Sequence, residues 1–314
     1  MKGNMKKLVL VLAALAALPF AGCQTDDAAK KGEKEPLKVL MVGNSFSISC
    51  LTYLPQVAAE CGKKLDLGSL YIGGCSLEQH VGNLLKERAA GMKDAKGAYL
   101  YDRVSADGKR KTLRNMRLTD ALKEAKWDIV TIQQASHLSW KKDSYHPWGD
   151  ELVRAIRELA PTAKILVQET WSYTPFDKRL KEWKMTPDEM HDQLKAAYAD
   201  FAKGYKFDMI CMGDAVQEWR RRLPVEYSEH SFGGDVVGGR NQKPENQFKR
   251  NADLTWAPNS DVFHLNAKGE YLQALVWAAT LFQTDLSKVV VRPAGVTDEE
   301  DRLLRLVARQ VSLK

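Results

Sequence analysis

The sequence predicts an α/β fold, a three-layer αβα sandwich around a central, mostly parallel sheet of about five strands. Three observations lead to this class. Short apolar runs alternate with amphipathic stretches, the connections between them are short, and polar residues gather directly after several apolar runs. Alternating strands and helices form a parallel sheet with helices on both faces, and such a sheet carries its site beyond the carboxyl ends of its strands.

The strands are predicted from short apolar runs bounded by turn residues. The first run is followed at once by Gly43-Asn44-Ser45, and the second ends at Gly73-Gly74. The polar stretch 94–115 carries two short apolar patches, and we interpret it as a hairpin. The strands expected in the parallel sheet are residues 37–42, 64–72, 128–133, 163–167 and 208–212.

The helices are predicted from 3.6-residue periodicity and from their caps. Ser76 stands where an N-cap is expected, with Gln79 three residues later, which is a capping-box pattern. The expected helices are 51–61, one that starts after Ser76, 119–126, 148–159, 187–202, a strongly apolar helix at 267–282, and an amphipathic closing helix at 297–311.

One stretch breaks the alternation. Residues 224–258 contain Gly233-Gly234 and Gly238-Gly239, many Asn and Arg residues, and no periodicity. Long irregular connections in compact domains tend to be functional or disordered. We therefore predict an irregular insertion at about 224–258 in a single domain that runs from 37 to 314.

The N-terminus has the pattern of an export signal. Three lysines precede an apolar run from 8 to 20, and small residues lead to Cys23. The run is too short to span a bilayer. Residues 20–23 resemble a bacterial lipobox, so residues 1–22 are a predicted lipoprotein signal peptide and Cys23 the lipidated first residue. The alternative is simple secretion with Cys23 inside the signal.

Residues 23–36 are charge-dense and lack aromatic residues, which is typical of a disordered tether. The expected location is the bacterial cell envelope, anchored to the outer membrane on its periplasmic or cell-surface side. The net charge is +7, and three of the positive charges are lysines of the signal. Acidic and basic residues are interleaved, and we interpret the one dense basic cluster, Arg220 to Arg222, as a solvated helix end. No nucleic-acid partner is expected.

The cysteine pattern points away from metal. Cys50, Cys61, Cys75 and Cys211 form no C-x-x-C pair and no His/Cys cluster at the spacing of a metal site. No metal or organic cofactor is expected. Cys50 and Cys75 both follow strand ends and could pair in an exported protein, but their spacing leaves the connectivity open.

Nucleophilic chemistry is the strongest prediction. A serine nucleophile needs a base to take its proton and a group that orients the base. Ser45 follows the first strand, and Asp261 and His264 stand three residues apart before the apolar helix. We predict that Ser45 attacks an ester carbonyl, that His264 takes and returns the proton, and that Asp261 fixes the imidazole.

The oxyanion that forms in such a reaction needs hydrogen-bond donors. The candidates are the backbone N–H of Ser45 and that of Gly73 or Gly74, where the missing side chain lets the backbone come close. The side-chain amide of Gln134, or less favourably that of Gln133, is expected to complete the oxyanion hole. Each of these residues alone is more often a cap, a turn or a solvated loop residue, and their joint occurrence at strand ends carries the prediction.

Three further residues are candidates for contacting substrate. His137 follows the glutamine pair, Asn44 supports the turn before Ser45, and Trp256 lies in the irregular segment, where an aromatic face could stack on a sugar ring. Ordinary core positions are the alternative for the tryptophans.

These motifs resemble the SGNH (GDSL-type) hydrolases, whose fold is flavodoxin-like. GNSFS, SLYIGGCSLEQH, TIQQASH and the late DxxH look like an SGNH-like family of bacterial exported lipoproteins of unassigned function, over residues 38–282. Two positions depart from the superfamily pattern. Asn44 replaces the usual aspartate, and Gln134 stands where an asparagine donor is usual.

The resemblance and the export signal together imply a lipid-anchored serine esterase whose partners are an acylated, most simply acetylated, carbohydrate and the membrane. The alternative is a carbohydrate-binding surface lipoprotein that has kept the fold with weak or no catalysis. A thioester, phospholipid or peptidoglycan O-acetyl substrate for the same triad is a third reading.

Overall fold

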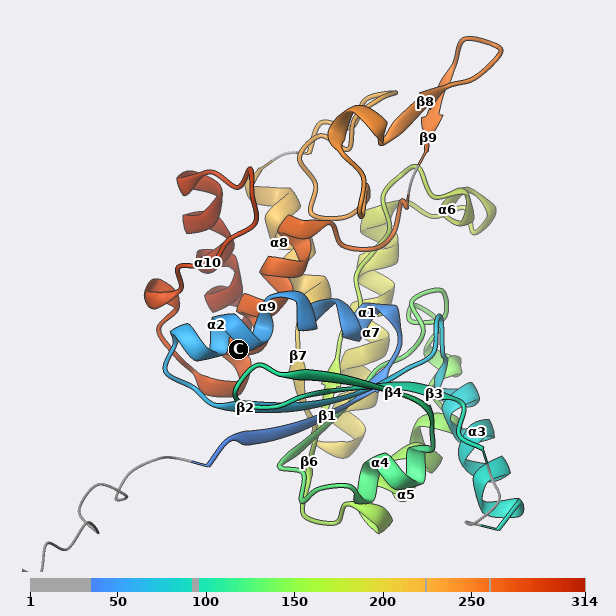
Figure 1. Ribbon diagram of the computed structural model, residues 1–314. Coiled ribbons are helices and arrows are strands. Elements are labelled where there is room, and N and C mark those ends of the chain that lie inside the picture. Colours follow the sequence, from blue (N-terminus) through green and yellow to red (C-terminus); the bar gives the residue numbers. More distant parts are fainter. Residues whose placement is uncertain (1–34, 92–95, 224, 260, 314) are drawn as a thin grey trace, which may run out of the picture. The chain divides into compact units, whose positions relative to one another are not determined.

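A seven-stranded sheet in the order β4-β3-β2-β1-β5-β6-β7 forms the centre of the molecule (Figure 1). The computed structural model describes residues 35–91, 96–223, 225–259 and 261–313. The predicted signal peptide, the lipidation site Cys23 and nearly all of the predicted tether lie outside these residues. The strands of the sheet are β1 Leu37–Gly43, β2 Leu65–Tyr71, β3 Tyr99–Val104, β4 Arg110–Met116, β5 Ile129–Ile132, β6 Lys164–Gln168 and β7 Asp208–Ile210.

The predicted α/β class with a mostly parallel sheet is confirmed. β1 pairs in parallel with both β2 and β5, β5 pairs with β6, and β6 pairs with β7. The two additional strands come from the predicted hairpin, because β3 and β4 join the edge beyond β2 in antiparallel pairing. The sheet therefore has the five expected parallel strands and a two-stranded antiparallel edge.

Helices cover both faces of the sheet. In Figure 1, α2, α9 and α10 lie over one face, and α3, α4 and α5 over the other. α8 packs against α9 and α10, and Phe201 of α7 packs against Gly149 of α5. The helices are α1 Ser45–Ile48, α2 Leu54–Glu60, α3 Leu77–Ala89, α4 Leu118–Lys123, α5 Trp148–Leu159, α6 Lys178–Glu182, α7 Pro187–Tyr205, α8 Met212–Arg222, α9 Ala267–Phe282 and α10 Asp298–Ser312.

Several helix starts follow from their caps. The Ser76 hydroxyl accepts a hydrogen bond from the Gln79 N–H, as the sequence predicts. Thr186 and Thr297 start α7 and α10 with complete capping boxes. The predicted helix 51–61 is wrong in its bounds, because helical structure begins at Ser45 and continues through a 3₁₀ turn, η2 Ser49–Thr52, before α2.

The insertion is partly ordered. It contains a two-stranded antiparallel ribbon, β8 Phe248–Arg250 and β9 Trp256–Pro258, which projects at the top of Figure 1. A single bridge pairs Val237 with Leu265, which lies beside the predicted base His264. The insertion thus leads directly back to the candidate site.

The basic cluster at the end of α8 is not wholly solvated. The Arg220 side chain is only 9% exposed and forms an ion pair of 2.8 Å with the buried Asp235 of the insertion. Its Nη1 also donates to the Ser172 hydroxyl. The interpretation of the triplet as a solvated helix end is therefore wrong for Arg220, since an unpaired Asp235 would be costly to bury.

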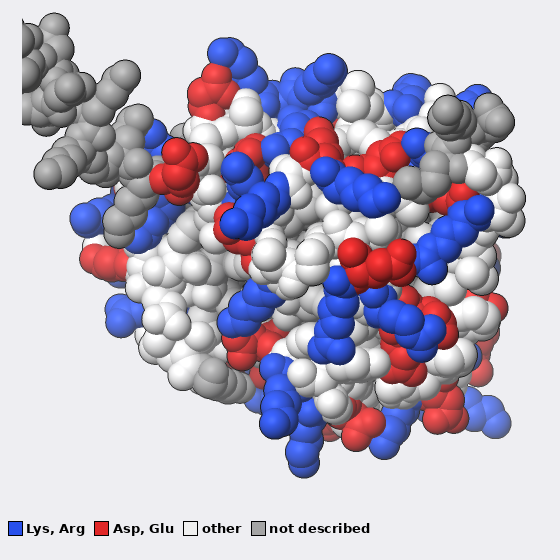
Figure 2. Space-filling model, turned by 90° about the horizontal axis from the view of Figure 1, so that it is seen from below, with Lys and Arg blue, Asp and Glu red and all other residues white. Residues whose placement is uncertain are grey.

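The charged side chains on the face seen from below are of mixed sign (Figure 2). Figure 2 shows basic and acidic side chains interleaved over the face seen from below, without a continuous basic surface. Among the described residues, no helix combines the length and the apolar character needed to cross a bilayer.

Candidate active site

Ser45 stands at a tight turn between β1 and α1. Asn44 has an extended backbone, caps α1 and accepts a hydrogen bond of 3.0 Å from the Phe46 N–H. A Cβ on Gly43 would lie 2.4 Å from the Ser47 hydroxyl, so any other residue there would push this side chain aside. Ser45 is half-buried and is the first residue of its helix, where the N–H has no partner within the helix.

Two glutamine side chains hold this turn from behind. The amides of Gln168, at the end of β6, and Gln273, on α9, both donate to the Phe46 carbonyl, at 2.8 and 2.7 Å. The Phe46 ring stacks on the buried Trp171, with 4.1 Å between ring centroids. These contacts join three distant parts of the chain beneath Ser45, and nothing in the sequence pattern pointed to the two glutamines.

The structure brings Ser45, His264 and Asp261 together. The Nε2 atom of His264 lies 2.7 Å from the Ser45 Oγ, and its Nδ1 is hydrogen-bonded to the Asp261 carboxylate. The other Asp261 oxygen accepts the backbone N–H groups of Phe263 and His264, each at 2.9 Å. Burial favours the neutral acid, but the hydrogen bonds from His264 outweigh it and hold the pKa of Asp261 below its ordinary value.

The insertion holds the loop that carries His264. The N–H of Gly238 donates to the His264 carbonyl and the N–H of Gly239 to the Asp261 carbonyl, both at 2.8 Å. Gly238 has a φ of 92° and faces the Phe232 ring so closely that a Cβ would lie 2.5 Å from it. This glycine therefore has both a conformational and a steric reason to be glycine.

A second loop approaches Ser45 after β2. The Asn44 side-chain amide donates to the Cys75 carbonyl at 2.9 Å, which ties the Gly73-Gly74 loop to the serine turn. Gly74 has a φ of 63°, and both glycines are exposed. The predicted backbone donors, on Ser45 and on one of these glycines, thus belong to two loops that are bonded to each other.

The glutamine pair does not supply the predicted amide donor. The Gln134 amide is buried and donates to the carbonyl and hydroxyl of Ser144, while its oxygen accepts from Leu77 and Ala135 N–H groups. The Gln133 amide donates to the Asn44 side chain at 2.7 Å. The assignment of Gln134 to the oxyanion hole is wrong, since its N–H groups are already bonded away from Ser45, and Gln133 supports the turn.

The three residues predicted to contact substrate lie in different surroundings. Asn44 is 1% exposed and its side chain is fully engaged, so the prediction that it contacts substrate is wrong. Trp256 lies on β9 with its ring against His230, and its described contacts include none with Ser45 or His264. His137 is half-exposed, and burial together with the nearby charges of Arg179 and Lys141 lowers its pKa.

An aromatic and basic wall stands beside the triad. The Arg179 guanidinium lies against the rings of both Tyr173 and Phe263, 4.3 and 4.4 Å from their centroids. Asp177 fixes it through two hydrogen bonds of 2.9 and 2.6 Å. The Phe263 ring also contacts the His264 imidazole, with centroids 4.2 Å apart. Arg179 was not identified from the sequence, where it is one of many basic residues.

Metal and disulfide chemistry find no support in the described residues. No group of three or more His, Cys, Asp or Glu side chains in this part of the chain is arranged to hold a metal ion. None of Cys50, Cys61, Cys75 and Cys211 is in a disulfide bond, so the Cys50–Cys75 pair is not formed. Burial raises the pKa of the Cys75 thiol to about 12, which leaves it unreactive.

Comparisons with known proteins agree with this fold. The family model described as "Domain of unknown function (DUF4886)" matches residues 38–217. A crystal structure of a DUF4886 family protein from Bacteroides uniformis is similar over 89% of this chain and 95% of that one, with 27% identity and a TM-score of 0.71. None of the curated proteins compared with this sequence matches it.

More distant solved structures carry the hydrolase names. A protein from Slackia heliotrinireducens described among the SGNH hydrolases has 18% identity, covers 79% of this chain and 100% of its own, and gives a TM-score of 0.44. A GDSL-like lipase from Bacteroides thetaiotaomicron has 15% identity, 77% and 87% coverage, and a TM-score of 0.36. The hydrolase names belong to those two proteins and say nothing of the substrate of this chain. The family of unassigned function that the sequence predicts agrees with the DUF4886 match.

Proposed function

The chain belongs to the DUF4886 family, and from that premise and the geometry around Ser45 we propose that it is an exported, lipid-anchored serine esterase. It removes acyl groups, most simply acetyl, from a carbohydrate. The single observation that carries the reaction class is the hydrogen-bonded series Ser45–His264–Asp261, with 2.7 Å between the Ser45 Oγ and the His264 Nε2. This is the arrangement in which a serine hydroxyl becomes a nucleophile.

The reaction follows from these contacts. As the Ser45 Oγ attacks the ester carbonyl carbon, its proton passes to the His264 Nε2. Asp261 keeps the imidazole proton on Nδ1 and stabilises the imidazolium that forms. The tetrahedral intermediate then expels the sugar oxygen, which takes the proton from His264. Water attacks the acyl-serine by the same route and releases the carboxylic acid.

The negative oxygen of the intermediate is held by backbone donors. We assign this role to the N–H of Ser45, at the start of α1, and to the N–H of Gly73 or Gly74, whose loop the Asn44 amide ties to the serine turn. Removing one oxyanion donor typically costs about 100- to 1000-fold in turnover. A hole without a side-chain amide is expected to give a modest esterase.

The carbohydrate, the location and the anchor are proposed from other features of the chain. The rings beside Arg179 reach the triad through Phe263, and the half-exposed His137 feels the charge of Arg179, so these side chains offer donors and aromatic edges that suit a hydroxylated ring. The N-terminal pattern supports a location in the bacterial envelope, with the chain anchored through lipid on Cys23. Neither metal nor cofactor is part of the proposed reaction.

The experiment is hydrolysis of p-nitrophenyl acetate and of an acetylated oligosaccharide panel by the full chain in detergent, beside its Ser45→Ala and His264→Ala forms. Turnover that both substitutions abolish, with the melting temperature retained, supports the proposal. Hydrolysis that persists in Ser45→Ala sinks it. The preferred member of the panel identifies the sugar.

A second candidate function has one observation in its favour. Because the Gln134 amide is committed to Ser144, the hole lacks its expected side-chain donor. A protein with these side chains around Ser45 but poor stabilisation of the oxyanion would act as a carbohydrate-binding surface lipoprotein. Sugar binding without turnover on any ester of the panel distinguishes this function from the esterase.

A further inference from the structure

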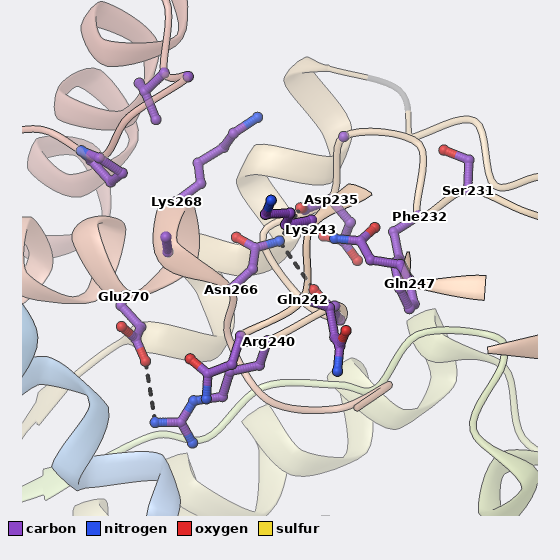
Figure 3. A pocket seen from close by; sticks show the side chains of 18 of the residues that line it. Ser231, Phe232, Asp235, Arg240, Gln242, Lys243, Gln247, Asn266, Lys268 and Glu270 are labelled. Carbon is purple, nitrogen blue, oxygen red and sulfur yellow. Dashed lines mark hydrogen bonds and ion pairs between the residues drawn. The ribbon is translucent and has the colours of Figure 1, made fainter. Parts of the chain in front are cut away.

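A cavity of about 640 Å³ adjoins the loop that carries the triad acid and base. Its walls come from the insertion, from the start of α9 and from residues 293–296, and several of the lining side chains are charged or carry amides (Figure 3). Neither Ser45 nor His264 lines it, so it is separate from the position of the nucleophile. A volume of this size falls within the range of small-ligand sites, roughly 300–1,000 Å³.

The cavity is built on the same backbone that holds the catalytic loop. Gly238 and Gly239 line the cavity and donate their N–H groups to the carbonyls of His264 and Asp261. Asn266, which also lines it, caps α9 two residues after His264. Any group bound there lies against the segment that positions the base.

Glu270 connects the cavity to the triad electrostatically. It lines the cavity from the first turn of α9 and forms an ion pair of 3.3 Å with Arg240. Burial raises its pKa, while Thr52, Arg240 and the charge of His264 act in the opposite direction. The charge of His264 thus acts on Glu270, a residue that lines the cavity.

The acidic groups of the cavity are already neutralised by the protein. Asp235 is paired with Arg220, and Glu270 with Arg240. Lys268 is hydrogen-bonded to Glu300. None of these carboxylates is therefore free to attract a cationic ligand.

Two basic side chains that line the cavity have hydrogen-bond donors or charge that the described part of the chain does not pair. The Arg240 Nε is buried and has no hydrogen-bond partner among the described residues, and an orphaned buried donor of this kind is costly unless a ligand or water satisfies it. In Figure 3 the Arg240 guanidinium reaches toward Glu270 at one end of the cavity. Lys243 also lines the cavity, is exposed, and makes no ion pair within the described ranges.

We propose that this cavity is a subsite for carboxylate-bearing sugar units, held by Arg240 and Lys243, of the glycan whose ester Ser45 cleaves. An arginine offers a planar fork of donors that matches a carboxylate, and a lysine adds a mobile charge. The inference rests on the proposed function for the identity of the ligand as part of the substrate. As a binding site it stands independently of turnover.

The test measures binding by calorimetry, with the Ser45→Ala form of the full chain in detergent so that no turnover interferes. The probes are trigalacturonate and the neutral, equally linked galactotriose. We expect trigalacturonate to bind at least about 10-fold more tightly, since its carboxylates accept charge-assisted hydrogen bonds that the neutral trisaccharide cannot form. Arg240→Gln and Lys243→Gln, each added to Ser45→Ala, should weaken its binding by about 10-fold or more, and Lys249→Gln, on the exposed part of β8, should leave it unchanged.

Two safeguards keep the test decisive. If Arg240→Gln lowers the melting temperature because it leaves Glu270 unpaired, Lys243→Gln, at an exposed position, decides. Equal affinity for the neutral trisaccharide, no binding of trigalacturonate, or binding that neither substitution weakens overturns the subsite. Ester hydrolysis by the wild type without uronate binding overturns the subsite and leaves the esterase, whereas Arg240-dependent binding without hydrolysis keeps the subsite and removes the esterase.

Discussion

The side-chain amide of Gln273 donates to the backbone carbonyl of Phe46 at 2.7 Å, across 227 positions of sequence. Its oxygen accepts the Ser49 hydroxyl at the same distance. Gln273 is fully buried on α9, the helix that follows the His264 loop, and Phe46 directly follows Ser45. One side chain therefore ties the turn of the nucleophile to the helix that follows the loop of the base.

Gln273→Met should separate these two elements. Methionine keeps the volume but leaves the Ser49 hydroxyl without its acceptor, at a cost of about 1–3 kcal/mol in the free energy of unfolding. Because a small displacement of reacting groups costs up to about 100-fold, kcat for p-nitrophenyl acetate should fall about 10- to 100-fold with little change in KM. Gln56→Met, on the exposed side of α2, is the matched control, and an unchanged kcat in Gln273→Met would contradict the argument.

Asp261→Asn tests the orienting group of the triad. The carboxylate accepts the His264 Nδ1–H and the backbone N–H groups of Phe263 and His264. Asparagine can present its amide to Nδ1 and so favour the wrong imidazole tautomer, which typically costs about 10⁴-fold in kcat. The measurement is steady-state hydrolysis beside Asp253→Asn on an exposed loop, and a loss below tenfold would show that Asp261 does not orient the base.

Much of the fold was predictable because local patterns agree with the final structure. The five parallel strands follow from apolar runs, and Ser76 is the N-cap that the sequence predicts. Ser45, Asp261 and His264 could be grouped because parallel strands bring their carboxyl ends to one edge, and the structure does place them within hydrogen-bonding reach.

The remainder depends on contacts that no local pattern encodes. Gln134 was placed at the correct strand end, but the direction of its amide is set by Ser144 and Leu77, which the sequence does not rank as partners. The sequence suggests a solvated Arg220, because its partner Asp235 lies in a segment without periodicity. Side-chain pairing across an irregular insertion is a tertiary property, so the cavity beside His264 could not be predicted.

Two glycine-to-alanine substitutions should have opposite effects on stability. A Cβ at Gly213, in the first turn of α8, would lie 2.3 Å from the Thr170 carbonyl oxygen and 2.9 Å from the Glu169 carboxyl group. The backbone oxygen cannot move aside, so Gly213→Ala should destabilise the fold by about 1–3 kcal/mol. A Cβ at Gly82, inside α3, meets nothing within 4 Å, so Gly82→Ala should stabilise it by about 0.5–1 kcal/mol. Urea unfolding of both variants checks the pair, and a stabilising Gly213→Ala would contradict the packing.

Glu169 gives the fold a defined pH dependence. Burial, and then the charge of Asp214, raises its pKa to about 8 from an ordinary value of 4.5. The folded chain therefore keeps a proton between these values that the unfolded chain has lost, so this group lowers the free energy of unfolding as pH rises through that window. Below it, both states are protonated and the effect vanishes.

Glu169→Gln removes this titration and keeps an acceptor for the Asp214 N–H, which donates to Glu169 at 2.9 Å. The melting temperature of the variant minus that of the wild type should increase from pH 5 to pH 9, with the exposed Glu78→Gln as control. A difference that stays constant over this range would mean that Glu169 is already ionised in the folded protein.

The last prediction concerns Arg179, because this residue of the aromatic and basic wall contacts Phe263, which in turn contacts the base His264. Its guanidinium packs against the rings of both Tyr173 and Phe263, and Phe263 lies against the His264 ring. Lysine would keep the charge but lose both the planar stacking and the two-point contact with Asp177. Phe263 would then be free to shift, and the imidazole with it.

Arg179→Lys should consequently lower kcat for p-nitrophenyl acetate by about 10- to 100-fold and leave KM nearly unchanged, since this small ester has no group that needs Arg179. Arg157→Lys is the matched control, because Arg157 also lies over a tyrosine ring, that of Tyr205, at 5.4 Å, on a different helix. If KM rises for an acetylated oligosaccharide while kcat is preserved on both esters, Arg179 binds the sugar directly and does not position His264.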